Sequence, residues 1–321
     1  MATDCAKTIA IDMMGGDDGL AVTVPACLQF LNKQSKTRLL LVGDTAQFQA
    51  QFSQYTDRVE FIHTDEAVAM DAQPAKALRH QKESSIHLMA QAVKDEQAQA
   101  GVSAGNTGAL VAISKYILKT VPNIARPALM AQIPARKKGS AWVLDLGANL
   151  YWEADQYLQF AQLAAESIKD KSKPTIGLLN IGTELIKGPE VLKEASDLLL
   201  EFQEDYSFEY KGFIEPNQIY SGDYDIILCN GLMGNIALKT AEGTFQFMSS
   251  YIKDQFKRTP LGMLAGMLAK PSFKRVKDNF SPSKRNGALL LGLTGIVIKS
   301  HGGTDVEGFL HAIQCANNQL K

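Results

Sequence analysis

Five short apolar runs in this sequence each end in a loop rich in glycine and asparagine, and an amphipathic helix pattern follows each loop. The loops cover residues 14–17, 103–108, 147–149, 181–188 and 230–235. They carry few bulky side chains and lead into helix starts, so their backbone N–H groups face any bound ligand. Because parallel strands bring such loops to one edge of a sheet, we expect all five to meet there. The pattern predicts an anion site, and phosphate is the anion that suits it best.

The loop 103–108, with the sequence SAGNTG, has the densest set of donors. Gly105 and Gly108 allow a ligand to approach the backbone closely, and Ser103, Asn106 and Thr107 add hydroxyl and amide groups. A glycine-rich turn with Asn106 or Thr107 as a plain N-cap explains the same residues equally well. Neither a P-loop nor a strand followed by G-x-G-x-x-G occurs, so these two routes to nucleotide binding have no support.

Two further loops each carry one residue that could take part in binding or catalysis. Lys187 could pair with a phosphate, although spacing alone favours a solvated charge at a helix entrance. Asn235 lies at a helix start, where it could cap the helix, donate to a carbonyl oxyanion, or do neither. Lys239 and Glu242 stand three residues apart, which predicts an ordinary intrahelical ion pair.

The remaining loop residues allow a functional and a structural interpretation. Gly15, Gly16 and Asp17 follow one apolar run and Asn149 follows another, but acidic and amide residues at strand ends are commonly caps. His301 is a candidate acid or base near the last strand, although a loop histidine is more often structural. No Cys–His pair indicates a covalent nucleophile. The loops are therefore suited to holding an anion rather than to attacking an acyl group.

Composition narrows the classes of protein that fit. The chain has 321 residues, 45% of them hydrophobic and 21% charged, with a formal net charge of −1, which argues against a nucleic-acid binder. Four scattered cysteines without a C-x-x-C pair, and histidines without ligand spacing, predict no bound metal and a reducing cytoplasm. The N-terminus shows no signal peptide, and no apolar run reaches the roughly 18 residues that a spanning helix needs.

Alternation of strand and helix patterns predicts an α/β fold with a parallel or mixed sheet covered on both faces. Residues 39–42 and 59–62 add strands, and apolar residues recur at helical intervals over 191–202 and 158–165. No fixed repeat and no low-complexity linker appears. We therefore expect one domain over residues 1–321, with a mobile excursion around 257–285.

The ordered set of motifs resembles the bacterial phosphate acyltransferase family over essentially the whole chain. The strings that carry the resemblance are IAIDMMGGD (9–17), SAGNTGAL (103–110), RPAL (126–129), LDLGAN (144–149), GLLNIG (177–182), GLMGN (231–235) and GALLLG (287–292), with Glu184, Lys187, Gly188, Lys239, Glu242 and His301. Asn230 and Leu232 depart from the family pattern, which commonly has Asp and Phe there. We assign Asn230 no acid or base role.

The resemblance implies a fold, an activity and partners. The fold would be a three-layer α/β/α sandwich with a mostly parallel, mixed sheet, as in phosphotransacetylases and isopropylmalate dehydrogenases. The enzyme would transfer a long-chain fatty acyl group from acyl carrier protein to inorganic phosphate, giving acyl phosphate for phospholipid synthesis. No cofactor is implied. The protein would be a homodimer at the inner face of the cytoplasmic membrane, where it would supply a membrane-bound glycerol-3-phosphate acyltransferase.

The resemblance also implies which residues form the site. Lys187 and Asn235 would be catalytic. Substrate and phosphate would be held by Gly15, Gly16, Asp17, Ser103, Gly105, Asn106, Thr107, Asn149, Asn180, Gly182, Gly234 and His301. A phosphotransacetylase-like enzyme acting on acyl-coenzyme A is the alternative, and a dehydrogenase relative or a non-catalytic phospholigand-binding module are more distant ones.

A segment near the C-terminus favours a lipid-linked or carrier-linked substrate. Between residues 253 and 285 the chain has nine Lys or Arg residues and two acidic ones. Cations that flank apolar side chains suit shallow insertion into anionic lipid, and they could also attract the acidic carrier protein. A dimer-interface helix with a solvated basic flank explains the segment equally well. The side chains expected to insert are Leu261, Met263, Leu264, Met267 and Leu268.

Overall fold

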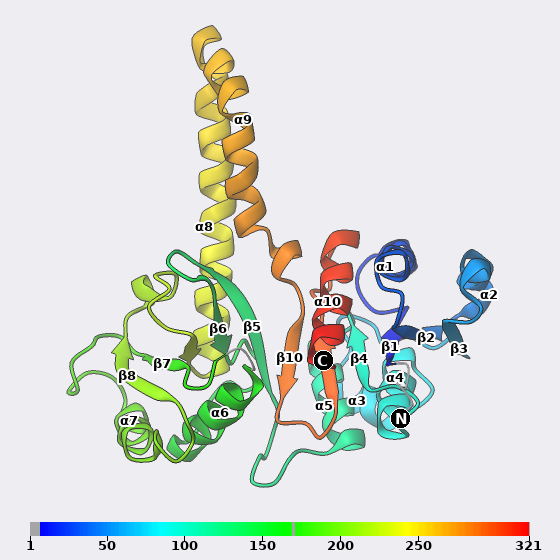
Figure 1. Ribbon diagram of the computed structural model, residues 1–321, viewed down its shortest axis with the longest axis horizontal. Helices are drawn as coiled ribbons and strands as arrows, with labels where there is room; N and C mark the ends of the chain where they lie inside the picture. The colour runs from blue at the N-terminus through cyan, green and yellow to red at the C-terminus, as the bar shows by residue number, and fades with distance from the viewer. Residues whose placement is uncertain (1–6, 169–170, 321) are drawn as a thin grey trace.

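The computed structural model describes residues 7–168 and 171–320, in which strands and helices alternate (Figure 1). The strands are β1 (Thr8–Asp12), β2 (Arg38–Gly43), β3 (Val59–His63), β4 (Ala100–Ser103), β5 (Ala128–Ala135), β6 (Gly139–Leu144), β7 (Thr175–Leu179), β8 (Glu209–Ile214), β9 (Ile226–Leu228), β10 (Ala288–Leu291) and β11 (Ile296–Lys299). The α-helices are α1 (Leu20–Lys33), α2 (Thr45–Phe48), α3 (Pro74–His80), α4 (Ser85–Lys94), α5 (Thr107–Leu118), α6 (Ala154–Ser167), α7 (Glu190–Phe202), α8 (Gly231–Lys257), α9 (Pro260–Phe280) and α10 (Val306–Gln319). Short 3-10 helices are η1 (Gln49–Tyr55), η2 (Pro216–Gln218) and η3 (Pro282–Arg285).

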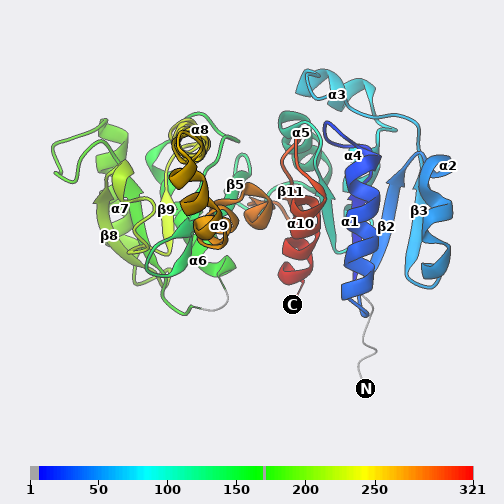
Figure 2. The same cartoon turned by 90° about the horizontal axis from the view of Figure 1, so that it is seen from above.

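All eleven described strands form one sheet, in the order β3-β2-β1-β4-β11-β10-β5-β6-β9-β7-β8. Neighbours are parallel from β3 to β11 and again from β6 to β8. Between these groups, β10 is antiparallel to β11 and β5, and β5 is antiparallel to β6. The two parallel groups therefore run in opposite directions across a central antiparallel pair. Viewed from above, they form two lobes (Figure 2).

Helices cover both faces of the sheet, as the alternation of strands and helices predicts. Ile9 and Ile11 of β1 point into a core shared with α1, α6, α7 and α10, whereas Ala10 points into a core shared with α4 and α5. On that second face a third cluster lies under the start of α8 and η2. Successive side chains of a strand point to opposite faces of the sheet. A strand that helices cover on both faces therefore consists of a nearly continuous apolar run.

The five apolar runs of the sequence are confirmed as β1, β4, β6, β7 and β9, and the helices expected at 158–165 and 191–202 are confirmed as α6 and α7. The expectation that all five loops leave one edge of a parallel sheet is wrong, because β6, β7 and β9 run opposite to β1 and β4. The twist of the sheet reduces the angle between the directions of these two groups of strands. At about 20–25° per strand, the five steps from β4 to β9 rotate the strand direction by about 100–125°.

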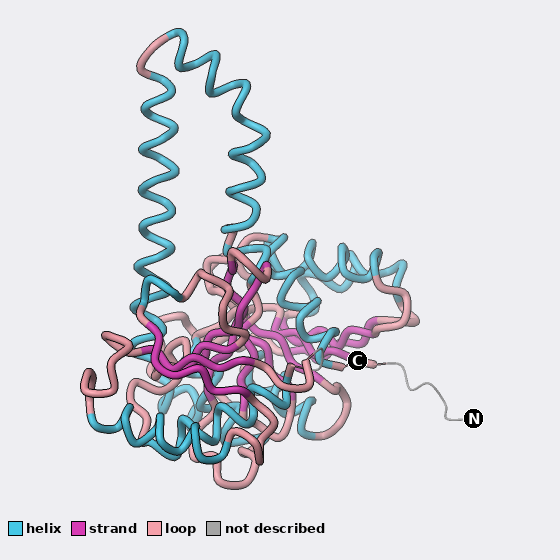
Figure 3. The backbone as a smooth tube through the Cα atoms, turned by 60° about the vertical axis from the view of Figure 1, so that its left-hand side comes forward, coloured by secondary structure: helices cyan, strands magenta, loops and turns pink. Residues whose placement is uncertain are grey.

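Helices α8 and α9 form a long hairpin that projects away from the sheet (Figures 1 and 3). The aromatic rings of Phe245 and Phe280 stack with centroids 5.2 Å apart, and those of Phe256 and Phe273 meet edge to face at 5.6 Å, so both pairs join the two helices. The segment expected to be a mobile excursion is thus helical over Pro260–Phe280, with Pro271 inside the helix. Its mobility and the single-domain organisation stay predictions. Within the described residues, no helix combines the length and the apolar character needed to cross a membrane.

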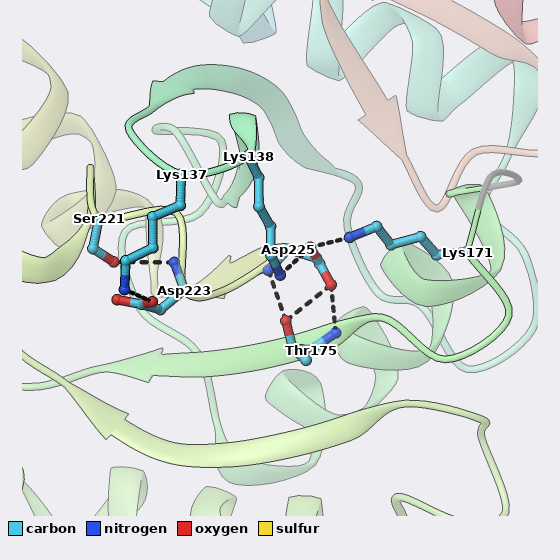
Figure 4. A network of polar contacts seen from close by, with 7 residues as sticks. All are labelled: Lys137, Lys138, Lys171, Thr175, Ser221, Asp223 and Asp225. Carbon is cyan, nitrogen blue, oxygen red and sulfur yellow. Dashed lines mark hydrogen bonds and ion pairs between the residues drawn. The ribbon is translucent and has the colours of Figure 1, made fainter.

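A buried carboxylate joins the start of β9 to its neighbours. Asp225 accepts hydrogen bonds from the Lys138 and Lys171 ammonium groups and from both the backbone N–H and the hydroxyl of Thr175 (Figure 4). Burial acts to raise the pKa of Asp225, but the hydrogen bonds from these partners outweigh it and lower the pKa below its ordinary value. This cluster fixes the β5–β6 turn and the start of β7 against β9.

Candidate functional site

A cavity with a volume of about 1030 Å³ lies over the central antiparallel strands. Its floor includes Leu129, Ala131 and Ile133, which alternate along β5 and therefore share one face. One wall is the face of α8 from Asn235 to Met248. The opposite wall comes from the start of α5 and the loop after β11. The cavity thus bridges the two oppositely directed groups of strands.

The loops after β1 and β4 touch each other beside this cavity. The Ser103 hydroxyl donates to Oδ2 of Asp12 at 2.6 Å, and Oδ1 of Asp12 accepts from the backbone N–H of Gly15 at 3.1 Å. A Cβ on Gly15 would lie 2.5 Å from Oδ2 of Asp12 and 2.6 Å from the nitrogen of Gly105. Only glycine therefore fits at this contact. Burial raises the pKa of Asp12, and the hydrogen bond from Ser103 acts against that increase.

The loop after β11 joins the same contact. The N–H of Asp17 donates to the carbonyl of Gly302 at 3.0 Å, and the N–H of Ser300 donates to the carbonyl of Ser103 at 2.8 Å. Gly16 adopts a φ of +98°, and a Cβ there would lie 3.0 Å from the Gly302 oxygen. The sequence-predicted residues Gly15, Gly16, Asp17, Ser103, Gly105 and His301 thus belong to three adjoining loops.

Asn106 serves as the N-cap of α5. Its Oδ1 accepts from the N–H of Ala109 at 3.0 Å, while its Nδ2 donates to the carbonyl of Met70 at 2.7 Å. The structural alternative, in which Asn106 is an N-cap, is therefore present. The same side chain also forms a hydrogen bond to the loop before α3. Thr107 follows in the first turn of α5 and lines the cavity.

On the opposite side, the loop after β6 supports the start of α8. Asp145 accepts hydrogen bonds from the N–H groups of Leu129, Gly147, Ala148 and Asn149. Burial raises the pKa of Asp145, although each of these bonds favours its ionised form. The Asn149 side chain donates to Asp145 and to the carbonyl of Pro127, so in this structure it braces the loop.

Asn235 reaches the cavity from the first turns of α8. A Cβ on Gly234 would overlap the carbonyl oxygen of Asp145, so this glycine permits α8 to sit directly on the loop after β6. A Cβ on Gly147 would lie 3.6 Å from the Asn235 side chain. Asn230 caps α8 by accepting from the N–H of Met233, while Asn235 remains directed to the cavity wall.

Four cationic side chains line the cavity together with the imidazole of His301, and they are Lys239, Lys277, Arg285 and Lys299. Lys239 pairs with Glu242 at 2.7 Å, which confirms the predicted intrahelical ion pair, and Lys299 lies across the cavity from it. His301 lines the opposite wall, and its pKa is lowered first by desolvation in the cavity and then by the nearby Lys239 ammonium. A neutral imidazole is the form that could accept a proton.

Lys187 is placed differently from the other predicted residues. It lies in the loop after β7 and pairs with Glu184 at 2.7 Å, and both side chains are largely exposed. Asn180 is buried in this loop, donates to the carbonyl of Lys187 at 3.0 Å and accepts from the N–H of Ile181. Gly182 packs against the Lys187 side chain. Of the sequence-predicted site residues, Thr107, Asn235 and His301 line the cavity. The others do not, and they are Gly15, Gly16, Asp17, Ser103, Gly105, Asn106, Asn149, Asn180, Gly182, Lys187 and Gly234.

Two residues of this region were missed by sequence reasoning. Asp12 anchors the contact between the first two loops, and Lys299 ends β11 with its side chain buried in the cavity wall. The available signal was a charged residue at the end of an apolar run, in the strings IAID and IVIK. Burial of such a charge depends on the neighbouring strands, which the sequence does not specify.

Comparisons with known proteins agree with this architecture. Residues 7–321 match the model of a family described as "Fatty acid synthesis protein". Relatives named "Phosphate acyltransferase" include those of Legionella pneumophila (strain Paris), 43% identical over 98% of this chain and 93% of its own length, and Bordetella parapertussis, 45% identical over 97% and 90%.

Solved structures add a likeness in fold. A phosphotransacetylase from Streptococcus pyogenes superposes with a TM-score of 0.65 at 19% identity, covering 99% of this chain and 95% of its own. A branched-chain phosphotransacylase from Enterococcus faecalis superposes with a TM-score of 0.61 at 14% identity, covering 98% and 99%. These likenesses confirm the mixed α/β fold with its large, mostly parallel sheet. The sequence matches establish more: this chain is an acyltransferase that belongs to the phosphate acyltransferase family of fatty acid synthesis proteins.

Proposed function

We propose that this protein transfers a long-chain fatty acyl group from acyl carrier protein to inorganic phosphate, and that the acyl phosphate feeds phospholipid synthesis. The single observation that carries this proposal is the 1030 Å³ cavity, which combines a polar end with an extended apolar wall. Membership of the phosphate acyltransferase family supports the acyl transfer itself.

The polar end of the cavity suits the chemistry. A phosphate oxygen attacks the thioester carbonyl, the tetrahedral oxyanion collapses, and the carbon–sulfur bond breaks to release the carrier thiol. Because a thiol has a pKa near 8.5, it leaves with little help from a general acid. The tasks that remain are to position phosphate and to stabilise the oxyanion. We assign the second task to Asn235, because its amide faces the cavity beside the start of α8.

The apolar wall suits a long acyl chain. Leu238, Ala241, Phe245 and Met248 recur every three or four residues along α8, so they form one stripe on the cavity side. About ten residues of helix give this stripe a length of about 15 Å. Each methylene group buried against it contributes about 0.8 kcal/mol, an advantage that a two-carbon acetyl group lacks. The stripe therefore favours a fatty acyl donor over a short acyl-coenzyme A.

One assay tests the proposal. Release of free thiol and formation of acyl phosphate are measured with long-chain acyl carrier protein and with acetyl-coenzyme A, each with and without inorganic phosphate. We expect phosphate-dependent release from the acyl carrier protein, with one acyl phosphate formed per thiol. A higher kcat/KM for acetyl-coenzyme A would favour the phosphotransacetylase-like alternative, and thiol release that ignores phosphate would exclude phosphorolysis.

We further propose that the protein acts as a homodimer on the inner face of the cytoplasmic membrane, next to a glycerol-3-phosphate acyltransferase. The α8–α9 hairpin supports this proposal, because it presents large apolar side chains that the body of the protein leaves exposed. Near its tip these are Leu261, Met263, Leu264, Met267 and Leu268, and along its length they include Phe247, Tyr251 and Val276. Tip residues suit lipid, and the residues along the shaft suit a second copy of the hairpin.

A further inference from the structure

Cations from α9, η3 and the β5–β6 turn gather beside the cavity at the base of the α8–α9 hairpin. Lys277 of α9 and Arg285 of η3 line the cavity. Nη2 of Arg285 donates to the carbonyl of Gly139 at 3.2 Å, which joins η3 to the β5–β6 turn. Arg136 is exposed in that turn, and Lys274 is exposed one helical turn before Lys277 on α9. We call Arg136, Lys274, Lys277 and Arg285 the basal cations.

The basal cations keep their charge free for a partner. Within residues 7–168 and 171–320, none of them forms an ion pair with a carboxylate. The guanidinium of Arg285 donates to two carbonyl oxygens, which leave its positive charge uncompensated. Neighbouring lysines differ in this respect, because Lys137 pairs with Asp223, and Lys284 pairs with Asp278 at 3.4 Å. The base of the hairpin is therefore a positively charged surface that suits an acidic partner.

A lipid surface at the hairpin tip does not account for these cations. From Leu264 to Lys277, α9 advances by about 20 Å, at about 1.5 Å per residue. At physiological ionic strength, exposed charges separated by more than about 8 Å are largely screened from one another. A membrane that holds the tip of an upright hairpin would thus exert little attraction on its base.

A carrier protein suits this position. An acyl carrier protein is acidic and presents its acyl group on a flexible phosphopantetheine arm, so it has to dock beside the cavity that the arm enters. Lys277 and Arg285 line the same cavity as Asn235, the residue assigned to the oxyanion. Complementary charge across such a contact speeds association and fixes the orientation of the partner.

We propose that the basal cations form the docking surface for acyl carrier protein, with Lys277 and Arg285 where the arm enters the cavity. The inference rests on the proposed function, because it locates the donor of the acyl group on the protein surface. It assigns the base of the hairpin to the carrier protein and leaves the tip to lipid.

The test measures carrier binding without turnover. Fluorescence anisotropy titrations use acyl carrier protein that bears its phosphopantetheine arm but no acyl chain, and no phosphate is added. We expect the double variant Lys274→Glu, Lys277→Glu to weaken the Kd at least tenfold. Raising the ionic strength from about 0.01 M to about 0.15 M shortens the Debye length from about 30 Å to about 8 Å, so it should weaken wild-type binding more than binding by the variant.

A matched variant controls for net charge. Lys33→Glu, Lys36→Glu makes the same change in net charge at the end of α1, in the other lobe of the molecule (Figure 2). It should keep the Kd for the carrier protein within twofold of the wild-type value. An equal loss of affinity in both double variants would overturn the inference, since net charge alone would then explain the binding.

Flotation with vesicles that contain anionic lipid separates the carrier protein from a membrane. We expect Lys274→Glu, Lys277→Glu to float as the wild type does, and to keep its mass in light scattering. Lost flotation with an unchanged Kd for the carrier protein would assign the basal cations to lipid instead, and a change in mass with an unchanged Kd would assign them to a contact between copies.

Two further outcomes are distinguishable. If the glutamate variant does not fold, as judged by circular dichroism, Lys274→Gln, Lys277→Gln replaces it, with an expected loss of affinity of at least threefold. If the wild type binds the carrier protein through these lysines but shows no phosphate-dependent transfer, the proposed function fails and the docking surface stands. Transfer without any dependence of carrier binding on these lysines would overturn the docking surface alone.

Discussion

Asp225 shows how one side chain supports several elements. It is 7% exposed and receives hydrogen bonds from two lysines and from Thr175, so its removal leaves buried donors without an acceptor. We expect Asp225→Asn to lower the free energy of unfolding by about 1–3 kcal/mol, measured by urea denaturation near pH 7. Asp223→Asn, which removes an exposed pair with Lys137, is the matched control and should change it by less than about 0.5 kcal/mol.

The pKa of Asp225 gives this prediction a pH dependence. Because its folded-state pKa lies below the ordinary value of 3.8, the stabilisation is fully present above that pH. It is lost as the pH falls further, toward the folded-state pKa. The stability difference between the wild type and Asp225→Asn should therefore be constant from about pH 5 to 7 and shrink below about pH 4. A difference that grows with acidification would contradict this account.

Two glycines should respond in opposite ways to the same added methyl group. Gly15→Ala forces a Cβ against Asp12 and Gly105, so we expect the kcat/KM for phosphate-dependent transfer to fall more than tenfold.

Gly243 lies in the exposed middle of α8, where an added Cβ would meet no atom within 4 Å, so Gly243→Ala should stabilise the protein by about 0.5–1 kcal/mol. Thermal unfolding of both variants provides the comparison, and a wild-type kcat/KM in Gly15→Ala would show that the loop contact tolerates displacement.

Among the elements, the α8–α9 hairpin is the one whose proposed insertion into lipid can be tested directly. Leu264 and Leu268 are 53% and 77% exposed and lie one turn apart on α9. We expect the double variant Leu264→Glu, Leu268→Glu to lose flotation with vesicles that contain anionic lipid, because glutamate opposes both burial and surface charge. Size-exclusion chromatography with light scattering supplies the control. Unchanged vesicle binding by a variant that is still dimeric would reject insertion, and loss of the dimer would assign these residues to the interface.

The molecule as a whole places its cavity where two oppositely directed groups of parallel strands meet. The start of α5 and the loop after β11 supply the polar wall, and α8, which follows β9, supplies the apolar stripe. Neither group of strands could form this cavity alone, so the acyl transfer proposed for it would require the complete sheet. Residues of β5 and Ala288 of β10 line the cavity, which is the space that the proposed substrate would occupy.

The amino-acid sequence by itself determined the elements and the family. Local periodicity is enough to define strands such as 9–12 and helices such as 191–202, and glycine-rich strings such as SAGNTG are specific enough to identify relatives. Short-range pairs follow the same logic, and the ion pair of Lys239 with Glu242 is one example.

Only the tertiary structure decided which of these residues share a cavity. The direction of β6, β7 and β9 depends on the antiparallel pair between the two parallel groups, and no local pattern encodes that pairing. The sequence grouped Lys187 with Ser103 and Asn235, and of these three only Asn235 lines the cavity. The fold also brings Lys299, which the sequence did not single out, into the cavity wall. The shared role of the three residues stays a prediction. A buried charge is recognised only when the surfaces that remove it from water are known, and those surfaces come from strands distant in the chain.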